Sequence, residues 1–176
     1  MTSIFVRSRS VIATLAVAAT IAGIAGCSLG GDSKLPPYTN PSTQVYDTST
    51  RVNIATMTRV DSQLYVSDVT VGTGRTVAYG DSIAVYYSGK LAGGYAFQTL
   101  ARPTAPLAAS LDTLNLIKGW TLGLPGMKVG GTRRLVVGPG NGYGFSIRVD
   151  NNGIVIIPSN SVLVFEVEVT RATPKL

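Results

Sequence analysis

The chain has 176 residues and a formal net charge of +6, and 45% of its residues are hydrophobic, which fits one domain with appendages. It contains no histidine and a single cysteine, Cys27, which excludes a Ser-His-Asp triad, a Cys-His pair, an intrachain disulfide and a Cys/His zinc site. The nine acidic residues form no evident cluster along the chain, so we expect neither a metal site nor another cofactor.

The first 26 residues have the pattern of a secretory signal peptide. Arg7 and Arg9 form a basic region, and an apolar run follows that ends in small residues. An ordinary signal peptide, or an anchor helix that happens to contain cysteine, fits the same composition. The end of the run, Ile24-Ala25-Gly26-Cys27, resembles the lipobox of bacterial lipoproteins, in which the cysteine is acylated. We therefore expect residues 1–26 to be a lipoprotein signal peptide and Cys27 to be the lipidated residue.

The resemblance to lipoproteins implies a location in the cell envelope. A lipidated Cys27 would make the membrane a partner, because two or more acyl chains give stable anchoring. The protein would then face the periplasm or another extracytoplasmic space. Ser28 follows the cysteine, where the lipoprotein sorting pattern uses an aspartate for retention in the inner membrane. This favours the outer membrane if two membranes are present.

Basic residues are scattered over the rest of the chain. Without Arg7 and Arg9, 13 basic and 9 acidic residues give a net charge of +4, and of these basic residues only Arg133 and Arg134 are adjacent. This pattern favours a solvated surface over nucleic-acid binding, so nucleic acid is not expected as a partner. A weak attraction to anionic lipid headgroups is left open.

Residues 27–52 predict a lipid-anchored flexible linker. They are rich in Ser, Thr, Asn, Asp, Gly and Pro and show no sustained hydrophobic period, which is typical of disorder. A flexible chain of about 25 residues spans roughly 25–30 Å, enough to hold a domain away from a membrane. The folded domain is expected from 53 to 176.

From residue 53 onward, short apolar segments alternate with turn residues, which predicts a β-rich domain. The expected strands cover 63–71, 77–79, 83–89, 95–97, 132–137 and 162–170. Gly93-Gly94 predicts a hairpin turn. We expect residues 98–109 to be irregular and residues 138–153 to form a long loop rich in Gly and Asn. In the last strand we expect Leu163, Phe165, Val167 and Val169 to point inward and Val164, Glu166 and Glu168 outward.

A short apolar helix near residue 116 carries the only tryptophan, Trp120. Asp112 or Asn115 can cap its start, and Gly123 followed by Pro125-Gly126 ends it. A helix of two turns is not stable alone, so the sheet must wrap around it. The predicted fold class is α+β, with five or six strands in a strongly bent antiparallel sheet around one short α-helix. The stretch from 115 to 143 then forms the floor of an apolar pocket, although each aromatic residue, taken singly, also fits a plain core position.

Six motifs follow one another between residues 63 and 169. They are Val85-Tyr86-Tyr87-Ser88-Gly89, Ala96-Phe97, Leu116-Ile117-Lys118-Gly119-Trp120, Met127-Lys128-Val129-Gly130, Gly142-Tyr143-Gly144, and Ile156-Ile157-Pro158 through Leu163-Val164-Phe165. In order and spacing they resemble the FKBP-type peptidyl-prolyl cis-trans isomerases. The resemblance implies a half-barrel sheet around the short helix, a hydrophobic proline pocket between them, and proline-containing polypeptides as substrates.

The resemblance also implies roles for individual residues. Trp120 would form the pocket floor, the hydroxyl of Tyr143 and the backbone N–H of Ile117 would donate hydrogen bonds to substrate carbonyls, and Ile157 would lie at the rim. The catalytic residues it implies are Tyr87, Phe97, Trp120, Tyr143 and Phe165. The substrate-binding residues it implies are Leu116, Ile117, Ile157, Gln98 and Leu107. Rotation about an X–Pro amide needs neither a nucleophile nor a metal.

Several positions depart from the family pattern. Gln98 stands where the family usually has an aspartate, and the arginine that pairs with that aspartate aligns with Pro103, next to Arg102. Leu107 and Ala109 replace aromatic residues. Two functions therefore stay open: an isomerase that assists the folding of extracytoplasmic proteins with attenuated activity, and a non-catalytic chaperone for proline-containing segments or an envelope scaffold lipoprotein. A monomer is expected.

Overall fold

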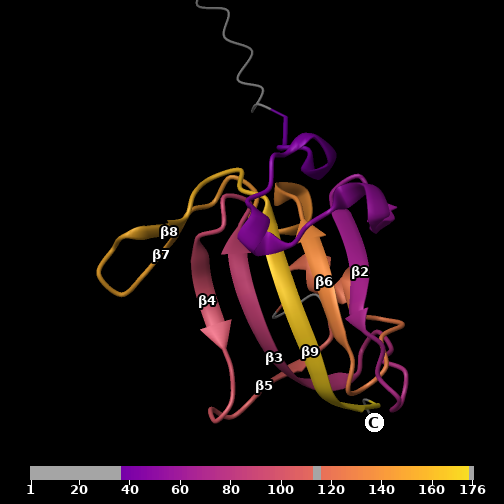
Figure 1. Ribbon diagram of the computed structural model, residues 1–176. Helices are drawn as coiled ribbons and strands as arrows, with labels where there is room; N and C mark the ends of the chain where they lie inside the picture. Colours follow the sequence, from indigo (N-terminus) through magenta and orange to yellow (C-terminus); the bar gives the residue numbers. More distant parts are fainter. Residues whose placement is uncertain (1–36, 113–115, 175–176) are drawn as a thin grey trace, which may run out of the picture. The chain divides into compact units, whose positions relative to one another are not determined.

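The centre of the fold is one antiparallel sheet, seen in a computed structural model that describes residues 37–112 and 116–174. Seven strands form this sheet in the order β1-β2-β6-β9-β3-β4, and β5 also pairs with β3 (Figure 1). The strands are β1 (Thr58–Asp61), β2 (Leu64–Thr70), β3 (Ser82–Leu91), β4 (Ala96–Leu100), β5 (Leu107–Ser110), β6 (Thr132–Val137) and β9 (Leu163–Thr173). The predicted antiparallel sheet with one short helix is confirmed, with seven strands instead of five or six.

Strand β3 organises one side of the sheet because two strands share its edge. Residues 82–85 of β3 pair with β5, and residues 87–90 pair with β4. The other edge of β3 pairs with β9 along its whole length. The prediction that residues 98–109 are irregular is therefore wrong at both ends of this range, because β4 extends to Leu100 and β5 begins at Leu107. The strand expected over 77–79 is also absent, since only Thr76 forms an isolated bridge, to Lys128.

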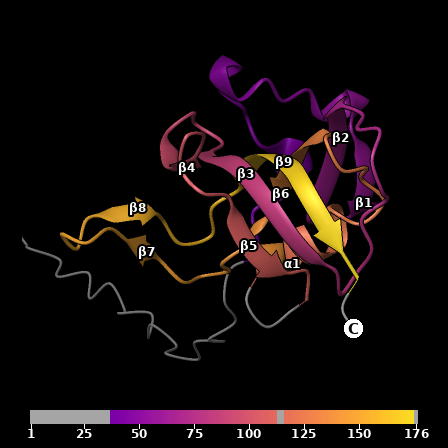
Figure 2. The same cartoon turned by 90° about the horizontal axis from the view of Figure 1, so that it is seen from below.

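The single α-helix among the described residues is α1 (Lys118–Gly123), which lies on one face of the sheet (Figure 2). Its first turn is preceded by Ile117 as N-cap, which makes no side-chain cap hydrogen bond. The predicted cap by Asp112 is therefore wrong, and Asn115, the other predicted cap, lies outside the described residues. No helix within the described ranges is long and apolar enough to cross a membrane.

Helix α1 lies unusually close to strand β6 because its facing residues are glycines. A Cβ atom placed on Gly119 would lie 2.5 Å from Cγ1 and 2.8 Å from Cγ2 of Val137. A Cβ atom on Gly123, one turn further along, would overlap the side chain of Leu135. The helix therefore packs its backbone, with no intervening side chain, against the methyl groups of β6.

The C-terminal end of α1 is held by Arg133 of β6. Its Nη1 donates to the backbone oxygens of Gly123 at 2.9 Å and Pro125 at 3.2 Å. The same guanidinium forms two hydrogen bonds with the carboxylate of Asp68 on β2, at 2.6 and 3.0 Å. Carbonyls at a helix end have no partner inside the helix, so Arg133 supplies the donors that α1 lacks.

The other face of the sheet is covered by the segment from residue 41 to 57 (Figure 2). This segment contains the short 3₁₀ helices η1 (Pro41–Thr43), η2 (Thr48–Thr50) and η3 (Ile54–Thr56), and a fourth, η4 (Pro139–Asn141), follows β6. Four side chains of the segment from residue 41 to 57 pack on a second apolar cluster of the sheet: Tyr46, Val52, Ile54 and Met57. Val164, predicted to point outward, does so but is only 4% exposed because it belongs to this cluster.

The prediction of a flexible linker over residues 27–52 is thus wrong for residues 37–52. They belong to the same compact unit as the domain, and their isolated apolar residues are buried against the sheet without any regular period. Residues 1–36, which include the expected signal peptide and Cys27, lie outside the described residues. The inward side chains of β9 agree with the prediction, since Leu163, Phe165, Val167 and Val169 are all buried.

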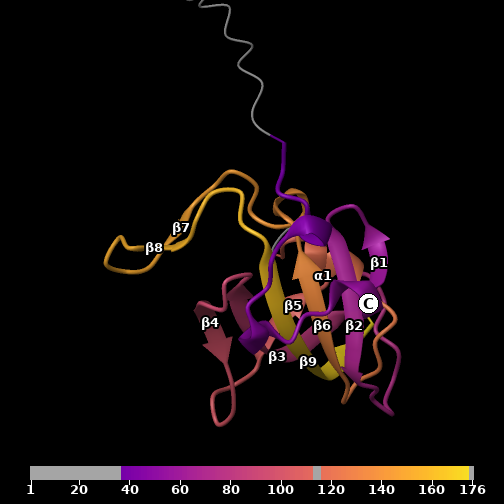
Figure 3. The same cartoon turned by 45° about the horizontal axis from the view of Figure 1, so that its top comes forward.

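The long loop expected after β6 carries a small hairpin of its own. Strands β7 (Arg148–Val149) and β8 (Val155–Ile157) pair only with each other, and the hairpin projects beyond the main sheet (Figures 1 and 3). Four of its apolar side chains are exposed: Ile147, Val149, Ile154 and Val155. Ile157, expected at the rim of a pocket, is instead 3% exposed and belongs to the main core.

The close contact between α1 and β6 predicts a steric penalty at Gly119. Gly119→Ala should lower the free energy of unfolding by about 1–2 kcal/mol, because overpacking against Val137 outweighs the gain in helix propensity. Gly93→Ala is the matched control, since no atom lies within 4 Å of a Cβ placed there, and it should stay within about 0.5 kcal/mol of the wild type. Urea denaturation measures both. Equal stability of the two variants would contradict the close contact.

Candidate functional site

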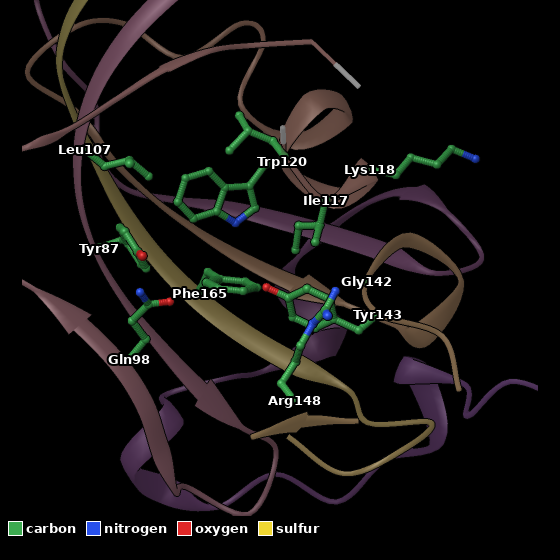
Figure 4. Close-up of a pocket in the computed structure, with 11 residues that line it drawn as sticks. Tyr87, Gln98, Leu107, Ile117, Lys118, Trp120, Gly142, Tyr143, Arg148 and Phe165 are labelled. Atoms are coloured by element: carbon green, nitrogen blue, oxygen red, sulfur yellow. The ribbon is translucent and has the colours of Figure 1, made fainter. Parts of the chain in front are cut away.

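A pocket of about 550 Å³ lies between α1 and the sheet (Figure 4). The residues that line it are Tyr87, Gln98, Leu107, Leu116, Ile117, Lys118, Trp120, Gly142, Tyr143, Arg148 and Phe165. Strands β3, β4, β5 and β9 supply one side, and α1 with its preceding residues supplies the floor. The loop after β6 and strand β7 complete the rim.

The floor is the indole of Trp120, which is 4% exposed. It packs edge to face with Tyr87, at a ring-centroid distance of 5.1 Å, and with Phe165, at 5.5 Å. Such perpendicular aromatic contacts stabilise a fixed ring orientation beyond simple area burial. The indole Nε1 is buried without a hydrogen-bond partner among the described residues, and it is directed toward the pocket (Figure 4).

Phe97 supports the pocket from behind and does not line it. Its ring is perpendicular to that of Phe165, with centroids 5.7 Å apart. Gly89 of β3 makes this arrangement possible, since a Cβ there would lie 2.6 Å from the Phe97 ring. Of the ten site residues implied by the resemblance, the pocket therefore includes all except Phe97 and Ile157.

Three uncharged polar side chains face the pocket: Tyr87, Gln98 and Tyr143 (Figure 4). None of them forms a hydrogen bond with another residue in the part of the chain that the structure describes. Burial, with a smaller contribution from Tyr143, raises the pKa of the Tyr87 hydroxyl above its ordinary value. This shift favours the neutral hydroxyl, which can donate a hydrogen bond.

Arg102, the candidate partner for position 98, lies elsewhere. Its guanidinium forms two hydrogen bonds with the Glu168 carboxylate, at 2.8 and 2.9 Å, and lies 4.4 Å from the ring centroid of Tyr86. These hydrogen bonds hold the pKa of Glu168 below its ordinary value. Gln98 is thus a neutral group that Arg102 does not partner, and none of the residues that line the pocket is acidic.

Sequence reasoning missed three lining residues: Lys118, Gly142 and Arg148. Lys118 and Gly142 lie inside the motifs that carried the resemblance, so their neighbours could have indicated them. Arg148 lies in the long loop, where no periodic pattern relates it to the pocket. Its guanidinium carbon lies 4.4 Å from the ring centroid of Tyr143.

The loop that carries Tyr143 is held from inside the domain. Asn141 is 3% exposed, and its Nδ2 donates to both carboxylate oxygens of Asp61, at 3.0 and 2.9 Å. The backbone N–H of Gly138 donates to the carbonyl of Gln63 at 2.7 Å. The position of Tyr143 therefore depends on the β1–β2 turn as well as on its own loop.

The same loop is held from outside by what we call the N-terminal clasp, formed by residues 37–39 with Asn160. The ring of Tyr38 stacks on Phe145, with centroids 5.1 Å apart. Asn160 accepts from the backbone N–H of Thr39 through Oδ1 at 3.0 Å and donates its own N–H to Gly144 at 2.9 Å. The clasp thus connects the segment that enters the domain to the two residues that follow Tyr143.

The chemistry of this pocket is that of a binding cavity with fixed aromatic walls and a few unpaired hydrogen-bonding groups. Among the described residues, no group of three His, Cys, Asp or Glu side chains is placed to hold a metal ion. The pocket can bind an apolar ring on Trp120 and offer hydrogen bonds from its rim to neighbouring polar groups. It offers no nucleophile of the kind used in hydrolytic enzymes.

The comparisons with known proteins agree with this geometry. The sequence profile of the FKBP-type peptidyl-prolyl cis-trans isomerases matches residues 73–170. An FK506-binding protein of Neisseria meningitidis is 34% identical over 108 residues, which are 61% of this chain and 94% of that protein. The crystal structure of FkpA from Escherichia coli has a TM-score of 0.57 and 34% identity, covering 67% of this chain and 52% of that one.

Other relatives are much longer than the matching region. FK506-binding protein 4 of Chaetomium thermophilum is 40% identical over 103 residues, which are 58% of this chain and 20% of that protein. The chain thus matches about a fifth of the length of this relative. The similarity concerns one domain of it.

The N-terminal clasp predicts a measurable effect on the loop that carries Tyr143. Tyr38→Ala removes the stack on Phe145, and Asn160→Gly removes the side-chain hydrogen bond while keeping a residue that tolerates the φ of 59° at this position. Each loss of about 1 kcal/mol should speed amide hydrogen exchange of residues 138–146 about fivefold. Tyr79→Ala, at a tyrosine that is 62% exposed, is the control. Unchanged exchange in both clasp variants would show that the loop does not depend on the clasp.

Proposed function

Because this chain belongs to the FKBP-type peptidyl-prolyl cis-trans isomerases, we propose that it rotates X–Pro bonds in polypeptides outside the cytoplasm. The observation that carries the proposal is the pocket itself. A buried indole forms its floor, perpendicular aromatic rings form its walls, and unpaired hydrogen-bonding groups lie at its rim. A proline ring fits the floor, because it is apolar and its nitrogen has no hydrogen to satisfy.

Rotation of an X–Pro bond needs loss of amide resonance, and an apolar pocket favours that loss. The uncatalysed barrier is roughly 18–20 kcal/mol, and the reaction takes tens to hundreds of seconds. The planar amide is more polar than its twisted form, so removing water raises the energy of the planar ground state relative to the transition state. Trp120, Tyr87 and Phe165 supply such surroundings without any covalent step.

Hydrogen bonds at the rim would hold the carbonyls on either side of the rotating bond. The Tyr143 hydroxyl points into the pocket (Figure 4), where it can donate to a substrate carbonyl. The backbone N–H of Ile117, at the start of α1, is the second donor proposed. If these carbonyls stay fixed while the amide turns, binding energy is used in the transition state.

Because residue 98 is a glutamine, we expect a lower isomerase activity than at a site with a carboxylate at this position. An amide accepts hydrogen bonds but carries no charge, and charge-assisted hydrogen bonds are roughly twice as strong as neutral ones. Arg102 does not compensate, because it is held by Glu168. The apolar floor and walls are independent of this position, so we propose attenuated turnover in place of none.

We propose further that the protein is a lipoprotein of the cell envelope. The support is the sequence Ile24-Ala25-Gly26-Cys27 behind a basic and apolar leader, in a region outside the described residues. A lipid on Cys27 would place the domain in an extracytoplasmic space, where newly exported chains contain X–Pro bonds. Such chains are the proposed substrates.

A second function, binding of unfolded segments without turnover, is favoured by one observation. The β7–β8 hairpin exposes four aliphatic side chains beside the pocket, with Ile154 61% and Ile147 52% exposed. Clustered exposed apolar residues usually mark binding surfaces. In this alternative the pocket would hold a proline while the hairpin contacts the neighbouring chain.

The isomerase assay with Tyr143→Phe tests the main proposal. The variant should lower kcat/KM for a proline tetrapeptide about twofold to twelvefold, because one neutral hydrogen bond to the substrate is lost. Its free energy of unfolding should change by less than about 0.5 kcal/mol, since the hydroxyl has no hydrogen-bond partner among the described residues. Tyr79→Phe, at an exposed tyrosine, should change neither quantity.

The outcome also separates the two functions. Turnover by the wild type at the uncatalysed rate, combined with saturable binding of the same peptide, would reject the isomerase and favour the binding function. Equal kcat/KM for the wild type and Tyr143→Phe would remove the proposed role of this hydroxyl.

The lipoprotein proposal predicts that the protein made in a bacterium sediments with membranes. Its mature N-terminal peptide should begin at Cys27 and carry the mass of acyl chains in mass spectrometry. Cys27→Ala should leave an unprocessed leader, because the modified thiol is missing, while Ser28→Ala serves as the neighbouring control. A wild-type protein found entirely in the soluble fraction, without an acyl mass, would reject the anchor.

A further inference from the structure

Four arginines of the domain are paired with carboxylates of the same chain. The pairs are Arg75–Asp81, Arg102–Glu168, Arg133–Asp68 and Arg134–Glu166, with N···O distances of 2.6 to 2.8 Å. These guanidinium groups are therefore already neutralised by their own surroundings. They leave little charge free to recognise an external carboxylate.

Arg148 at the pocket rim is different. Its guanidinium lies over the ring of Tyr143, and it forms no ion pair or hydrogen bond with any residue of the described ranges. The acidic residue of the same hairpin, Asp150, uses its Oδ1 to accept from the backbone N–H groups of Asn152 and Ile154, both at 2.9 Å. Arg148 thus presents an unpaired cation at a binding pocket.

The charge of Arg148 is not balanced by the rest of the pocket. None of the 11 lining residues is acidic, and Gln98 on the opposite wall is neutral. Lys118 is the second cation of the lining, but its ammonium points away from the cavity (Figure 4). The pocket therefore has one inward cation and no inward anion.

We infer that this pocket selects proline segments that carry a carboxylate side chain next to the proline, and that Arg148 recognises it. The inference rests on the proposed binding of X–Pro segments and adds the charge of the residue beside the proline. The Tyr143 hydroxyl, directed at the cavity, contacts the carbonyl that flanks the proline. Because Arg148 is stacked on the same ring, the side chain within its reach belongs to an adjacent residue.

The stacking makes Arg148 a suitable carboxylate receptor. A guanidinium is planar, weakly hydrated and able to donate two parallel hydrogen bonds to a carboxylate. The contact with the Tyr143 ring holds its plane through a cation–π interaction. Less side-chain freedom is then lost when a carboxylate binds, which a flexible lysine at this position could not offer.

The test compares three acetylated and amidated peptides, Ala-X-Pro-Phe with X as Glu, Gln or Lys. Trp120 is the only tryptophan of the chain, so its fluorescence reports binding at the pocket floor, and NMR exchange on the same peptides reports isomerisation. The Glu peptide should bind about twofold to fivefold more tightly than its neutral Gln counterpart, and the Lys peptide less tightly, as expected for a solvent-accessible ion pair. The preference should shrink as salt is raised, because the pair is screened.

Arg148→Gln should abolish the ratio between the Glu and Lys peptides, and Arg148→Glu should reverse it. Arg171→Gln is the matched control, since it removes the same charge from an exposed position outside the pocket and should leave the ratio unchanged. Equal binding of all three peptides by the wild type would overturn the inference while leaving the proposed function intact. If Arg171→Gln changed the ratio as much as Arg148→Gln, the effect would come from net charge, which would also overturn it. Failure of every peptide to bind would reject the inference together with the proposed function.

Discussion

The fold depends on the contact between a six-residue helix and the strand beneath it. Helix α1 is too short to be stable in water, yet its indole forms the pocket floor. Gly119 and Gly123 let its backbone reach the methyl groups of β6, and Arg133 of the same strand supplies donors to its last carbonyls. The helix therefore takes its stability from β6, which is itself fixed between β2 and β9.

The pocket follows from this contact, because α1 carries Trp120, whose indole is the pocket floor. The indole is held by Tyr87 and Phe165 at right angles, and Phe97 supports Phe165 through the space that Gly89 leaves. The walls thus form a chain of perpendicular rings that begins on the helix and ends on the edge strand β4. A site of this kind is shaped before any ligand arrives, which is the condition under which binding energy is not spent on ordering the protein.

The sequence predicted those parts of the molecule whose pattern is local. Alternation of apolar residues located β2, β3, β6 and β9, and the motifs around Tyr87, Trp120 and Tyr143 indicated the pocket through the family resemblance. Residues 41–52 were mistaken for part of a linker because their buried apolar residues, Tyr46 and Val52, are isolated and follow no period. Their burial depends on the outer face of the sheet, which no local pattern reveals. The Arg102–Glu168 pair was missed because its two residues are far apart in the sequence. Arg148 was missed because the path of its loop brings it to the pocket.

The N-terminal clasp makes the loop that carries Tyr143 sensitive to a force applied to the chain before residue 37. A pull on the chain from its N-terminal side reaches the domain first at Tyr38 and Thr39, before the sheet bears any load. Loss of these contacts would leave the strand pairing of the sheet unchanged, because Tyr38 and Thr39 belong to no strand. Their loss would release Phe145 and Gly144, the neighbours of Tyr143. Tension on the chain before Tyr38 would therefore reach the mouth of the pocket through the neighbours of Tyr143.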